Sequence, residues 1–301
     1  MKIKHILESQ QFDKDTINLI FRTADKMART KLLPLKGKIM ASLFYEPSTR
    51  TRFSFESAML RLGGNIITSE NAKEFSSAAK GETIEDTIRV VNRYADIIVL
   101  RHYEKGAAKR AAAVSNIPII NAGDGAGQHP TQALLDLYTI QKELGKIDGT
   151  SIAFVGDLKN GRTVRSLAYL LGKYDKVKMY FISPKQLAIG NDIKEYLSDH
   201  QVLFEEHEKW DNTLGKIDVL YQTRIQKERF KTIEEYDSFK GSYILTPKEV
   251  LQMKPKSIIM HPLPRVDEIT PEVDQMPNAK YFEQARYGLL IRMALLVLLL
   301  K

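Results

Sequence analysis

The chain has 301 residues, 43% of them hydrophobic, which is enough for two domains of ordinary size with apolar cores. It contains no cysteine, and this excludes disulfides, thiolate metal sites and cysteine nucleophiles. The net charge of +8 allows either nucleic acid or an acidic substrate, but the lysines are scattered among glutamates and no basic tract is interleaved with aromatic residues.

The first half of the chain alternates helix-like segments with short β-rich apolar runs. Apolar residues between Ile17 and Ala28 recur at helical spacing, and a second apolar stripe with Phe55 and Leu62 follows Ser48. This β-α-β-α order indicates a parallel sheet covered on both faces. The predicted strands are 38–45, 65–69, 96–100 and 117–121, and the helices between the later ones are 83–95 and 103–115.

The second half repeats the pattern after a glycine-rich segment. A helix is expected at about 131–145, and the strongly apolar segment 285–300 is expected to be a helix that packs back onto the first unit. The sequence therefore predicts an α/β fold of two doubly wound parallel-sheet domains, 1–130 plus 285–301 and 131–284, joined by interdomain helices. The predicted strands of this half are 151–156, 176–183, 217–222, 257–262 and 279–282.

The two ends of the chain show no pattern of a targeting signal or a membrane span. The first residues, MKIKHILESQQFDKDT, lack the apolar core and the cleavage site of a signal peptide. The uncharged apolar run at the other end, Met293–Leu300, has eight residues and is far short of the ~18 needed to cross a bilayer. We therefore expect a cytoplasmic protein.

Polar clusters follow the predicted strands at their carboxyl ends. Because ligands of open parallel sheets bind beyond these ends, we expect the clusters to form a ligand site. The clusters are 46–52, 101–102, 123–132, 156–163, 223–229 and 261–265.

The cluster EPSTRTR places Arg50 in the first turn of a helix, with Ser48 as its expected N-cap. Arginine is unfavourable beside the positive end of a helix dipole unless an anion joins it, and first-turn N–H groups bind phosphate. The alternative is an ordinary capped helix with surface arginines. We favour the anion site.

His129 lies where the glycine-rich segment meets the next helix, one turn before Gln132. A lone histidine is usually structural, but with Arg101 at the neighbouring strand end these groups could polarise a carbonyl oxygen. Arg162 lies at the start of a second predicted helix, so the argument made for Arg50 predicts a second anion site there. The segment around Arg162 is a poor dinucleotide turn, because the GxGxxG spacing is wrong and no acidic residue is placed to hold a ribose.

Three further segments are ambiguous on their own. Arg224 and Gln226 could grip a carboxylate, or could belong to a charged surface loop. The prolines of HPLPR stiffen the backbone, so that its carbonyl groups could act as fixed acceptors. Ser76 and Lys80 lie in a small-residue segment whose composition is typical of a flexible surface loop.

Taken together, these motifs resemble the aspartate/ornithine carbamoyltransferase family over nearly the whole chain. Within it, TRIQKER and HPLPR are typical of the enzymes that use aspartate, whereas the ornithine enzymes have a cysteine in place of Pro262 and a serine-methionine-glycine loop. This chain has neither. The matching motifs are STRTR (48–52), AAKGE (78–82), VLRH (99–102), GDGAGQHPTQ (123–132), VGDLKNGRT (155–163), TRIQKER (223–229) and HPLPRVDEI (261–269).

The resemblance implies a carbamoyl phosphate-binding domain at 1–130 plus 285–301 and an aspartate-binding domain at 131–284. By the same resemblance, the phosphate ligands would be Ser48, Thr49, Arg50 and Thr51; the carbonyl ligands Thr51, Arg101 and His129; and the ligands of the carbamoyl amine Gln132 and the backbone carbonyls of Leu263 and Pro264. Ser76 and Lys80 would reach the site of a neighbouring subunit. The aspartate ligands would be Lys80, Arg162, Arg224 and Gln226, and the catalytic residues Arg50, Thr51, Lys80, Arg101 and His129. Glu46, Glu228, Arg229 and Arg265 match residues that support a closed form.

The implied reaction transfers the carbamoyl group of carbamoyl phosphate to the amine of L-aspartate, a step of pyrimidine biosynthesis, with no cofactor and no metal. The implied assembly is a homotrimer with active sites shared between neighbouring chains, to which a regulatory chain can add, and with no nucleic-acid or membrane partner. Two alternatives stay open: a carbamoyltransferase for another amine such as ornithine, and a non-enzymatic basic binding protein that only the net charge favours.

Overall fold

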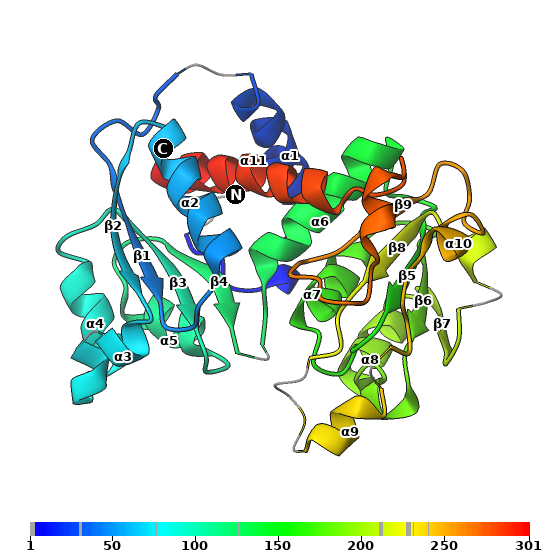
Figure 1. Cartoon of the computed structure of the whole chain (residues 1–301). Coiled ribbons are helices and arrows are strands. Elements are labelled where there is room, and N and C mark those ends of the chain that lie inside the picture. The colour runs from blue at the N-terminus through cyan, green and yellow to red at the C-terminus, as the bar shows by residue number, and fades with distance from the viewer. Residues whose placement is uncertain are drawn as a thin grey trace. The chain divides into compact units, whose positions relative to one another are not determined.

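The computed structural model describes residues 4–29, 32–75, 77–125, 127–210, 213–226, 230, 232–239 and 241–301 (Figure 1). The chain divides into two compact units: unit 1 is Met1–Leu135 with Arg286–Lys301, and unit 2 is Asp136–Ala285. Two helices, α6 (Pro130–Leu144) and α11 (Tyr281–Leu300), begin in one unit and end in the other.

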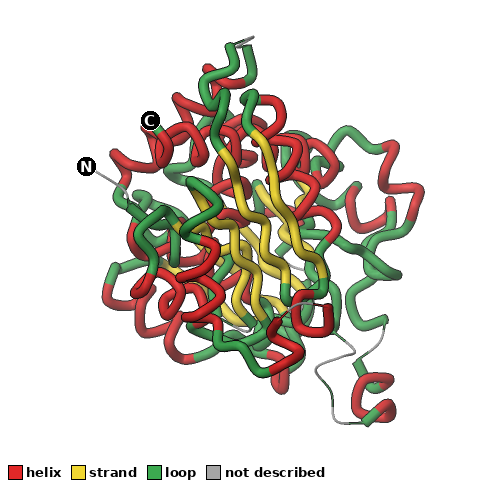
Figure 2. The backbone as a smooth tube through the Cα atoms, turned by 90° about the vertical axis from the view of Figure 1, so that its left-hand side faces the viewer, coloured by secondary structure: helices red, strands yellow, loops and turns green. Residues whose placement is uncertain are grey.

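Unit 1 is built on a four-stranded sheet in the order β2-β1-β3-β4, whose strands run side by side and parallel (Figure 2). The register places Phe44, the last residue of β1, beside Arg101 in β3. Successive residues of β3 and β4 are all buried, so both faces of the sheet are covered there, as in other parallel sheets. The strands are β1 (Ile39–Phe44), β2 (Asn65–Glu70), β3 (Ile97–His102) and β4 (Ile119–Asp124).

The helices of unit 1 pack their apolar faces inward. α1 begins after Asp13, whose side chain accepts a hydrogen bond from Thr16 N at 2.8 Å. In α11, Ile291 is fully buried and Arg292 Nη1 donates to Ser54 Oγ of α2 at 2.8 Å, so the part of this helix after Ala285 packs within unit 1. The other helical segments are α1 (Lys14–Met27), α2 (Thr49–Arg61), α3 (Ala72–Phe75), α4 (Ile84–Val91), α5 (Ala107–Val114), and the 3-10 helices η1 (Ser9–Gln11) and η2 (Ser77–Lys80).

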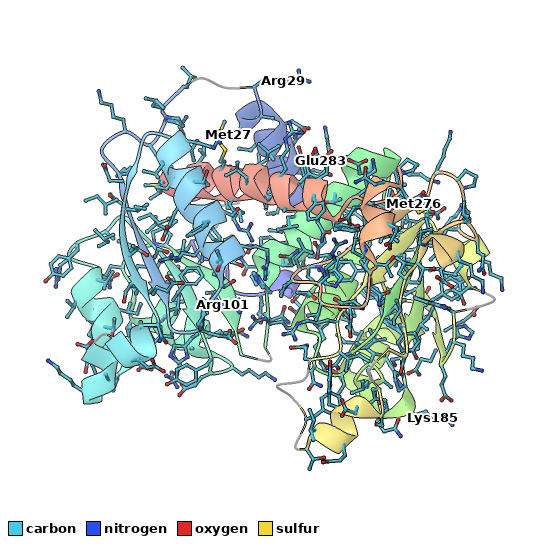
Figure 3. The ribbon with its side chains drawn as sticks, in the orientation of Figure 1. Met27, Arg29, Arg101, Lys185, Met276 and Glu283 are labelled. Atoms are coloured by element: carbon cyan, nitrogen blue, oxygen red, sulfur yellow. The ribbon has the colours of Figure 1, made fainter. Side chains whose placement is uncertain are left out.

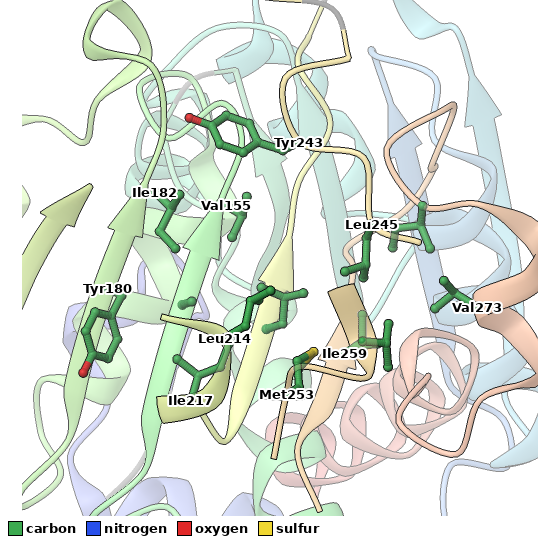
Figure 4. Close-up of a cluster of buried hydrophobic side chains, with 14 of the residues drawn as sticks. Val155, Tyr180, Ile182, Leu214, Ile217, Tyr243, Leu245, Met253, Ile259 and Val273 are labelled. Atoms are coloured by element: carbon green, nitrogen blue, oxygen red, sulfur yellow. The ribbon is translucent and has the colours of Figure 1, made fainter. Parts of the chain in front are cut away.

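Unit 2 contains a five-stranded parallel sheet in the order β7-β6-β5-β8-β9. Figure 4 shows its core, where Val155 and Ile182 of neighbouring strands lie in one cluster with Leu245 and Val273. The strands are β5 (Ser151–Val155), β6 (Lys178–Ile182), β7 (Leu203–His207), β8 (Val219–Gln222) and β9 (Ile258–Met260). The helical segments are α7 (Arg162–Leu171), α8 (Asn191–Asp199), α9 (Ile233–Asp237), α10 (Pro247–Val250), η3 (Lys185–Leu187), η4 (Leu214–Lys216) and η6 (Pro271–Gln275).

The predicted class, α/β with two parallel sheets, is confirmed, but three details were wrong. No strand forms at 279–282: Ala279 makes one isolated bridge with Ile259, and α11 begins at Tyr281, because this short run continues into a long helical segment. β7 was not predicted, because the edge strand LFEEH is charged and partly exposed and has no apolar run. The segment around Lys80, expected to be a loop, contains α3 and η2.

Within the described ranges, no helix is long and apolar enough to cross a membrane. The same ranges contain no group of three or more histidine or carboxylate side chains that could hold a metal ion. The polar clusters identified in the sequence lie at or after the carboxyl ends of the strands.

Candidate active site

In unit 1, three of the predicted clusters follow neighbouring strands of one sheet. β3 pairs with both β1 and β4, so the segments that follow these three strands leave the sheet at the same edge. The segments after β1 and β4 carry Ser48–Thr51, His129 and Gln132, and Arg101 is the next-to-last residue of β3. The fold of unit 1 therefore places these groups at one edge of its sheet.

The two arginines at the start of α2 have different surroundings. Arg52 Nη2 lies 2.8 Å from Glu70 Oε2, so this guanidinium forms an ion pair with the end of β2. Arg50 is exposed in the first turn of the helix. Arg50 is the more exposed of the two, so its guanidinium is accessible to an anion from solvent.

The residues around Arg50 add hydroxyl groups to the helix start. Ser48 occupies the predicted N-cap position, although its side chain makes no capping bond within the described part of the chain. Thr49 is exposed and Thr51 is buried. The first turn of α2 thus combines hydroxyl groups, a guanidinium and the positive end of the helix dipole, which together suit a phosphate.

The guanidinium of Arg101 is buried at the end of β3 (Figure 3). Its Nη2 atom lies 2.9 Å from Glu46 Oε2, and its Nη1 atom donates to the backbone oxygen of Ala122 at 3.2 Å. A buried cation needs such partners, because an unpaired charge in the protein interior is strongly unfavourable. The two contacts also fix the plane of the guanidinium, so Arg101 is a preorganised donor.

His129 and Gln132 are buried at the start of α6. The amide of Gln132 donates to the backbone oxygen of His129 at 3.0 Å. The loop before them is held by Asp124, whose carboxylate accepts bonds from the amides of Gly106 and Gln128, both at 2.8 Å. Sequence reasoning missed this role of Asp124, and the available signal was an acidic residue between two glycines at a strand end.

His102, next to Arg101 in the same motif, has a structural role. Its Nδ1 atom accepts a bond from Glu104 N at 3.0 Å, and its ring centroid lies 4.7 Å from that of Tyr45. Burial lowers the pKa of His102. This histidine is therefore a neutral part of the packing at physiological pH.

Lys80 ends the 3-10 helix η2 and is exposed on unit 1, in the segment that follows the edge strand β2. Ser76, which the resemblance pairs with Lys80, lies outside the described residues. Glu228 and Arg229 lie outside them as well.

In unit 2, three predicted clusters again follow neighbouring strands. β8 pairs with both β5 and β9, so the segments after these strands leave the sheet at one edge. Gly156 shows how closely two of them approach: its φ is +114°, and a Cβ there would lie 2.3 Å from the backbone oxygen of Thr223. Only glycine fits such a position. The segments that carry Arg162 and Arg224 are therefore adjacent where they leave the sheet.

Arg162 is the first residue of α7 and is half-buried. Asp157 closes the turn before it, since its Oδ1 atom accepts a bond from the amide of Asn160 at 3.0 Å and its Oδ2 atom one from the side chain at 3.0 Å. The sequence did not indicate this role for Asn160. The turn presents Arg162 at a helix N-terminus, as the pattern predicted.

Arg224 and Gln226 follow β8 and are half-buried. The segment is anchored at its start, because Thr223 donates to the backbone oxygen of Val155 twice, from its amide at 2.8 Å and from its hydroxyl at 2.9 Å. Arg224 therefore leaves the sheet beside the end of β5. The charged-loop alternative for Lys227 falls outside the described residues.

Leu263 and Pro264 lie in the turn that follows β9, with Leu263 half-buried and Pro264 exposed. Leu263 has a φ of +53°, in the left-handed region that a residue with a bulky side chain rarely adopts. Its amide donates to His261 Nδ1 at 2.8 Å. The carbonyl groups of this turn are therefore part of a tightly bonded backbone segment.

Arg265, at the end of the same motif, is bonded within unit 2. Its guanidinium contacts Asp274 through two nitrogens, one of them 2.6 Å from Oδ2, and also donates to Tyr281 Oη at 3.2 Å. The bond to Asp274 raises the pKa of Arg265, and the bond from Arg265 lowers the pKa of Asp274. Arg265 therefore braces the turn against η6 and the start of α11.

Two family models match the chain along almost its full length. The model described as aspartate/ornithine carbamoyltransferase, carbamoyl-P binding domain, matches residues 4–142. The model described as aspartate/ornithine carbamoyltransferase, Asp/Orn binding domain, matches residues 148–299.

Curated relatives are similar over nearly the whole chain. The chloroplastic aspartate carbamoyltransferase of Arabidopsis thaliana is 58% identical over 305 residues, which cover 99% of this chain and 78% of that protein. The aspartate carbamoyltransferase catalytic subunit of Methanocaldococcus jannaschii is 55% identical over 299 residues, which cover 98% of this chain and 97% of that subunit.

Solved structures share the backbone as well. The catalytic subunit of aspartate transcarbamoylase from M. jannaschii superposes with a TM-score of 0.91 at 54% identity, covering 98% of this chain and 97% of that one. Aspartate transcarbamoylase from Trypanosoma cruzi, in complex with carbamoyl phosphate and aspartate, superposes with a TM-score of 0.94 at 42% identity, covering 99% and 97%.

Proposed function

The chain belongs to the aspartate/ornithine carbamoyltransferase family, and from this premise we propose that it transfers the carbamoyl group of carbamoyl phosphate to the amine of L-aspartate, releasing N-carbamoyl-L-aspartate and phosphate. One observation carries the choice of acceptor: Arg162 and Arg224 leave neighbouring strands at one edge of the unit 2 sheet. Two guanidinium groups suit a dicarboxylate and repel a cationic amine such as ornithine.

Unit 1 binds carbamoyl phosphate in this proposal. The phosphate accepts bonds from the hydroxyl groups and amides of Ser48, Thr49 and Thr51 at the start of α2, and from the guanidinium of Arg50. Gln132 binds the carbamoyl amine, and the family resemblance adds the backbone carbonyls of Leu263 and Pro264, which belong to unit 2.

The chemistry follows from the charges. The deprotonated amine of aspartate attacks the carbamoyl carbon and forms a tetrahedral intermediate whose oxygen becomes negative. Thr51, Arg101 and His129 stabilise this oxyanion, and a well-placed donor in such a site contributes roughly 3–4 kcal/mol. The C–O bond to phosphate then breaks, and the departing phosphate takes the proton of the amine. The remaining acceleration comes from holding two anions in attack geometry.

Unit 2 binds the acceptor. Arg162, Arg224 and Gln226 bind the carboxylates of aspartate, and Lys80 of a neighbouring chain adds a further cation. Steady-state assays with aspartate and with ornithine test the assignment. We expect carbamoyl transfer to aspartate and none to ornithine, and an enzyme that prefers ornithine would overturn the proposed acceptor.

The exposed apolar surface of unit 1 supports a homotrimer. Leu32 is 74% exposed and Phe53 54%, and an open groove of about 550 Å³ on α2 is lined by Phe53, Glu56, Ser57, Leu60 and Arg61. Apolar surface of this kind is typical of an interface between subunits. In a cyclic trimer the contacts close head to tail, which would bring Lys80 of one chain to the site of the next.

Complementation tests the shared site. Chains with Arg50→Ala and chains with Lys80→Ala, each expected to be inactive, are refolded together in a one-to-one mixture. Every mixed trimer then has one site with both wild-type residues, so activity returns to about a quarter of the wild-type value. A mixture that stays inactive, with trimers verified by mass, would refute the shared site.

Three wider assignments belong to the same proposal. We assign the reaction to pyrimidine biosynthesis, and we assign the protein to the cytoplasm from its sequence pattern, although plant relatives are named chloroplastic. The third assignment is that a regulatory chain binds in a larger assembly. Measuring the mass of the native particle with and without candidate chains tests it.

A further inference from the structure

A small cavity lies within unit 2, beyond the end of β8. Its volume is about 20 Å³, and most of its wall comes from residues of the segments 222–225 and 241–244. The end of β5, the helix α9 and the end of the turn that follows β9 complete the wall. All of the lining residues belong to unit 2, so the cavity is a feature of this unit alone.

The segment that forms one side of the cavity is held in place by the core. Tyr243 is buried, and its Oη atom donates to the backbone oxygen of Glu208 at 2.7 Å. The amide of Leu245 donates to the backbone oxygen of Glu268 at 2.9 Å, and the amide of Thr270 donates to that of Leu245 at 3.0 Å. Figure 4 shows Tyr243 and Leu245 beside the apolar side chains of this core. The cavity is therefore enclosed by bonded, packed segments.

Gln222, the last residue of β8, brings a buried amide to the cavity. Its side-chain nitrogen donates to the backbone oxygen of Tyr243 at 3.1 Å. A carbonyl oxygen can only accept, so the amide nitrogen must face Tyr243 and the amide oxygen must face away from it. Among the described residues, this oxygen is buried and has no hydrogen-bond partner. Because a buried acceptor without a partner is unfavourable, Oε1 of Gln222 calls for a donor.

The size and chemistry of the cavity suit one water molecule. A water needs about 10–15 Å³ of such space, so the cavity has room for one, whereas sites for small organic ligands measure about 300–1,000 Å³. The hydroxyls of Thr223 and Ser242 line the same cavity and donate to the backbone oxygens of Val155 and Phe239, at 2.9 and 2.7 Å. Their oxygens keep lone pairs that can accept a hydrogen from water.

A metal ion fits the cavity less well. Hard cations take about six or more oxygen ligands. The carboxylate of Glu268, which lines the cavity, is already bonded at both oxygens: Oε1 lies 2.7 Å from His261 Nε2, and Oε2 accepts from the amides of Val266 and Asp267 at 3.1 and 3.2 Å. Too few oxygens remain to surround a cation.

We propose that this cavity is a binding site for one ordered water molecule, which donates one hydrogen to Gln222 Oε1 and the other to a hydroxyl oxygen of the wall. The water completes the hydrogen bonding of the amide that ends β8, directly before the segment that carries Arg224. The site is part of the fold of unit 2 and does not depend on the proposed function.

A crystal structure of the protein at about 1.5 Å resolution tests the site, with Gln284 as the internal control. Gln284 is as deeply buried as Gln222, at 1% exposure, but both ends of its amide are bonded. Its Nε2 atom donates to Asp136 Oδ1 at 2.6 Å, and its Oε1 atom accepts from the amide of His261 at 2.9 Å. We expect a water peak about 2.5–3.0 Å from Gln222 Oε1 and none at that distance from Gln284 Oε1.

Two variants sharpen the test. Gln222→Met keeps the length of the side chain and removes the acceptor, so the water peak should disappear. Tyr243→Phe is the matched control, because it removes the bond to Glu208 and leaves the Tyr243 backbone oxygen and the Gln222 amide intact. It should lower the melting temperature and retain the water.

A wild-type crystal structure with no peak at Gln222 Oε1 would overturn the inference, and so would a peak that persists unchanged in Gln222→Met. A peak with several oxygen contacts at about 2.0–2.6 Å would identify a cation and would overturn it equally. If Gln222→Met does not fold, the wild-type structure decides. None of these outcomes bears on carbamoyl transfer, which the kinetic assays test separately.

Discussion

Arg101 of unit 1 is more deeply buried than Arg162 and Arg224 of unit 2. Arg101 forms an ion pair with Glu46 and donates to the backbone oxygen of Ala122. Arg162, the first residue of α7, and Arg224, two residues after β8, are half-buried. Donors that meet a charge developing in the transition state act best when fixed in advance, whereas an acceptor substrate must enter and leave. We infer that unit 1 determines the rate of the chemical step and unit 2 the choice of acceptor.

The largest effect should come from unit 1. We expect Arg50→Ala to lower kcat/KM by roughly 10²–10³-fold, because a charged contact to the phosphate is lost. The melting temperature should not change, since Arg50 is exposed. Arg52→Ala is the control: it breaks the ion pair with Glu70 and should affect catalysis much less. A large drop in the melting temperature of Arg50→Ala without ligand would show that Arg50 is structural and would refute the proposed anion site.

Arg224→Ala should have the next largest effect and a different signature. We expect the KM for aspartate to rise by roughly 30-fold or more, because truncating one partner of a charged contact costs about 2–5 kcal/mol. The affinity for carbamoyl phosphate should stay near normal. Initial rates and direct binding measure the affinity for each substrate. Equal losses of affinity for aspartate and for carbamoyl phosphate would contradict the assignment of the acceptor to unit 2.

A matched pair of carboxylates sharpens the comparison. Asp124 holds the loop before His129 in unit 1, and Asp157 closes the turn before Arg162 in unit 2. We expect Asp124→Asn to lower kcat by about tenfold and Asp157→Asn to raise the KM for aspartate by about tenfold, because each loosens the group that follows it. Identical kinetic signatures for the two variants would contradict the comparison.

The smallest effect concerns stability and pH. The bond from Arg265 lowers the folded-state pKa of Asp274 below its usual 3.8. Ionised Asp274 therefore stabilises the folded state above pH 3.8, and this contribution is lost as the pH falls through the lower folded-state value. Asp274→Asn should lower the unfolding free energy by about 1 kcal/mol at pH 7, and by less at acidic pH once the carboxyl of the folded protein begins to protonate, measured by urea titration.

Asp96→Asn is the unit 1 counterpart. The Lys38 side chain is 42% exposed and that of Asp96 33%, at 2.9 Å, so solvent screens this pair more strongly. Its effect at pH 7 should therefore be smaller than that of Asp274→Asn. The reverse order would show that exposure does not set the strength of these pairs.

The parallel strands were predictable because most are runs of aliphatic residues buried on both faces. β7 was not, because an edge strand can carry charges such as those of Glu205 and Glu206. The positions of Arg50 and Arg162 at helix starts also followed from local pattern. Their tertiary partners did not: nothing near Arg52 in sequence indicates Glu70, and nothing near His261 indicates Gln284, since both contacts depend on the packing of distant segments.

The return of α11 into unit 1 has a consequence for folding. The buried side chain of Ile291 and the bond from Arg292 to Ser54 belong to a segment that follows the whole of unit 2, and this bond joins residues 238 positions apart in sequence. Unit 2 is one continuous stretch, Asp136–Ala285, and needs no contact of this kind with a segment beyond its own ends. The entropic cost of closing a loop grows with its length, and chains dominated by distant contacts fold more slowly. We therefore expect unit 2 to reach its native packing before unit 1 does.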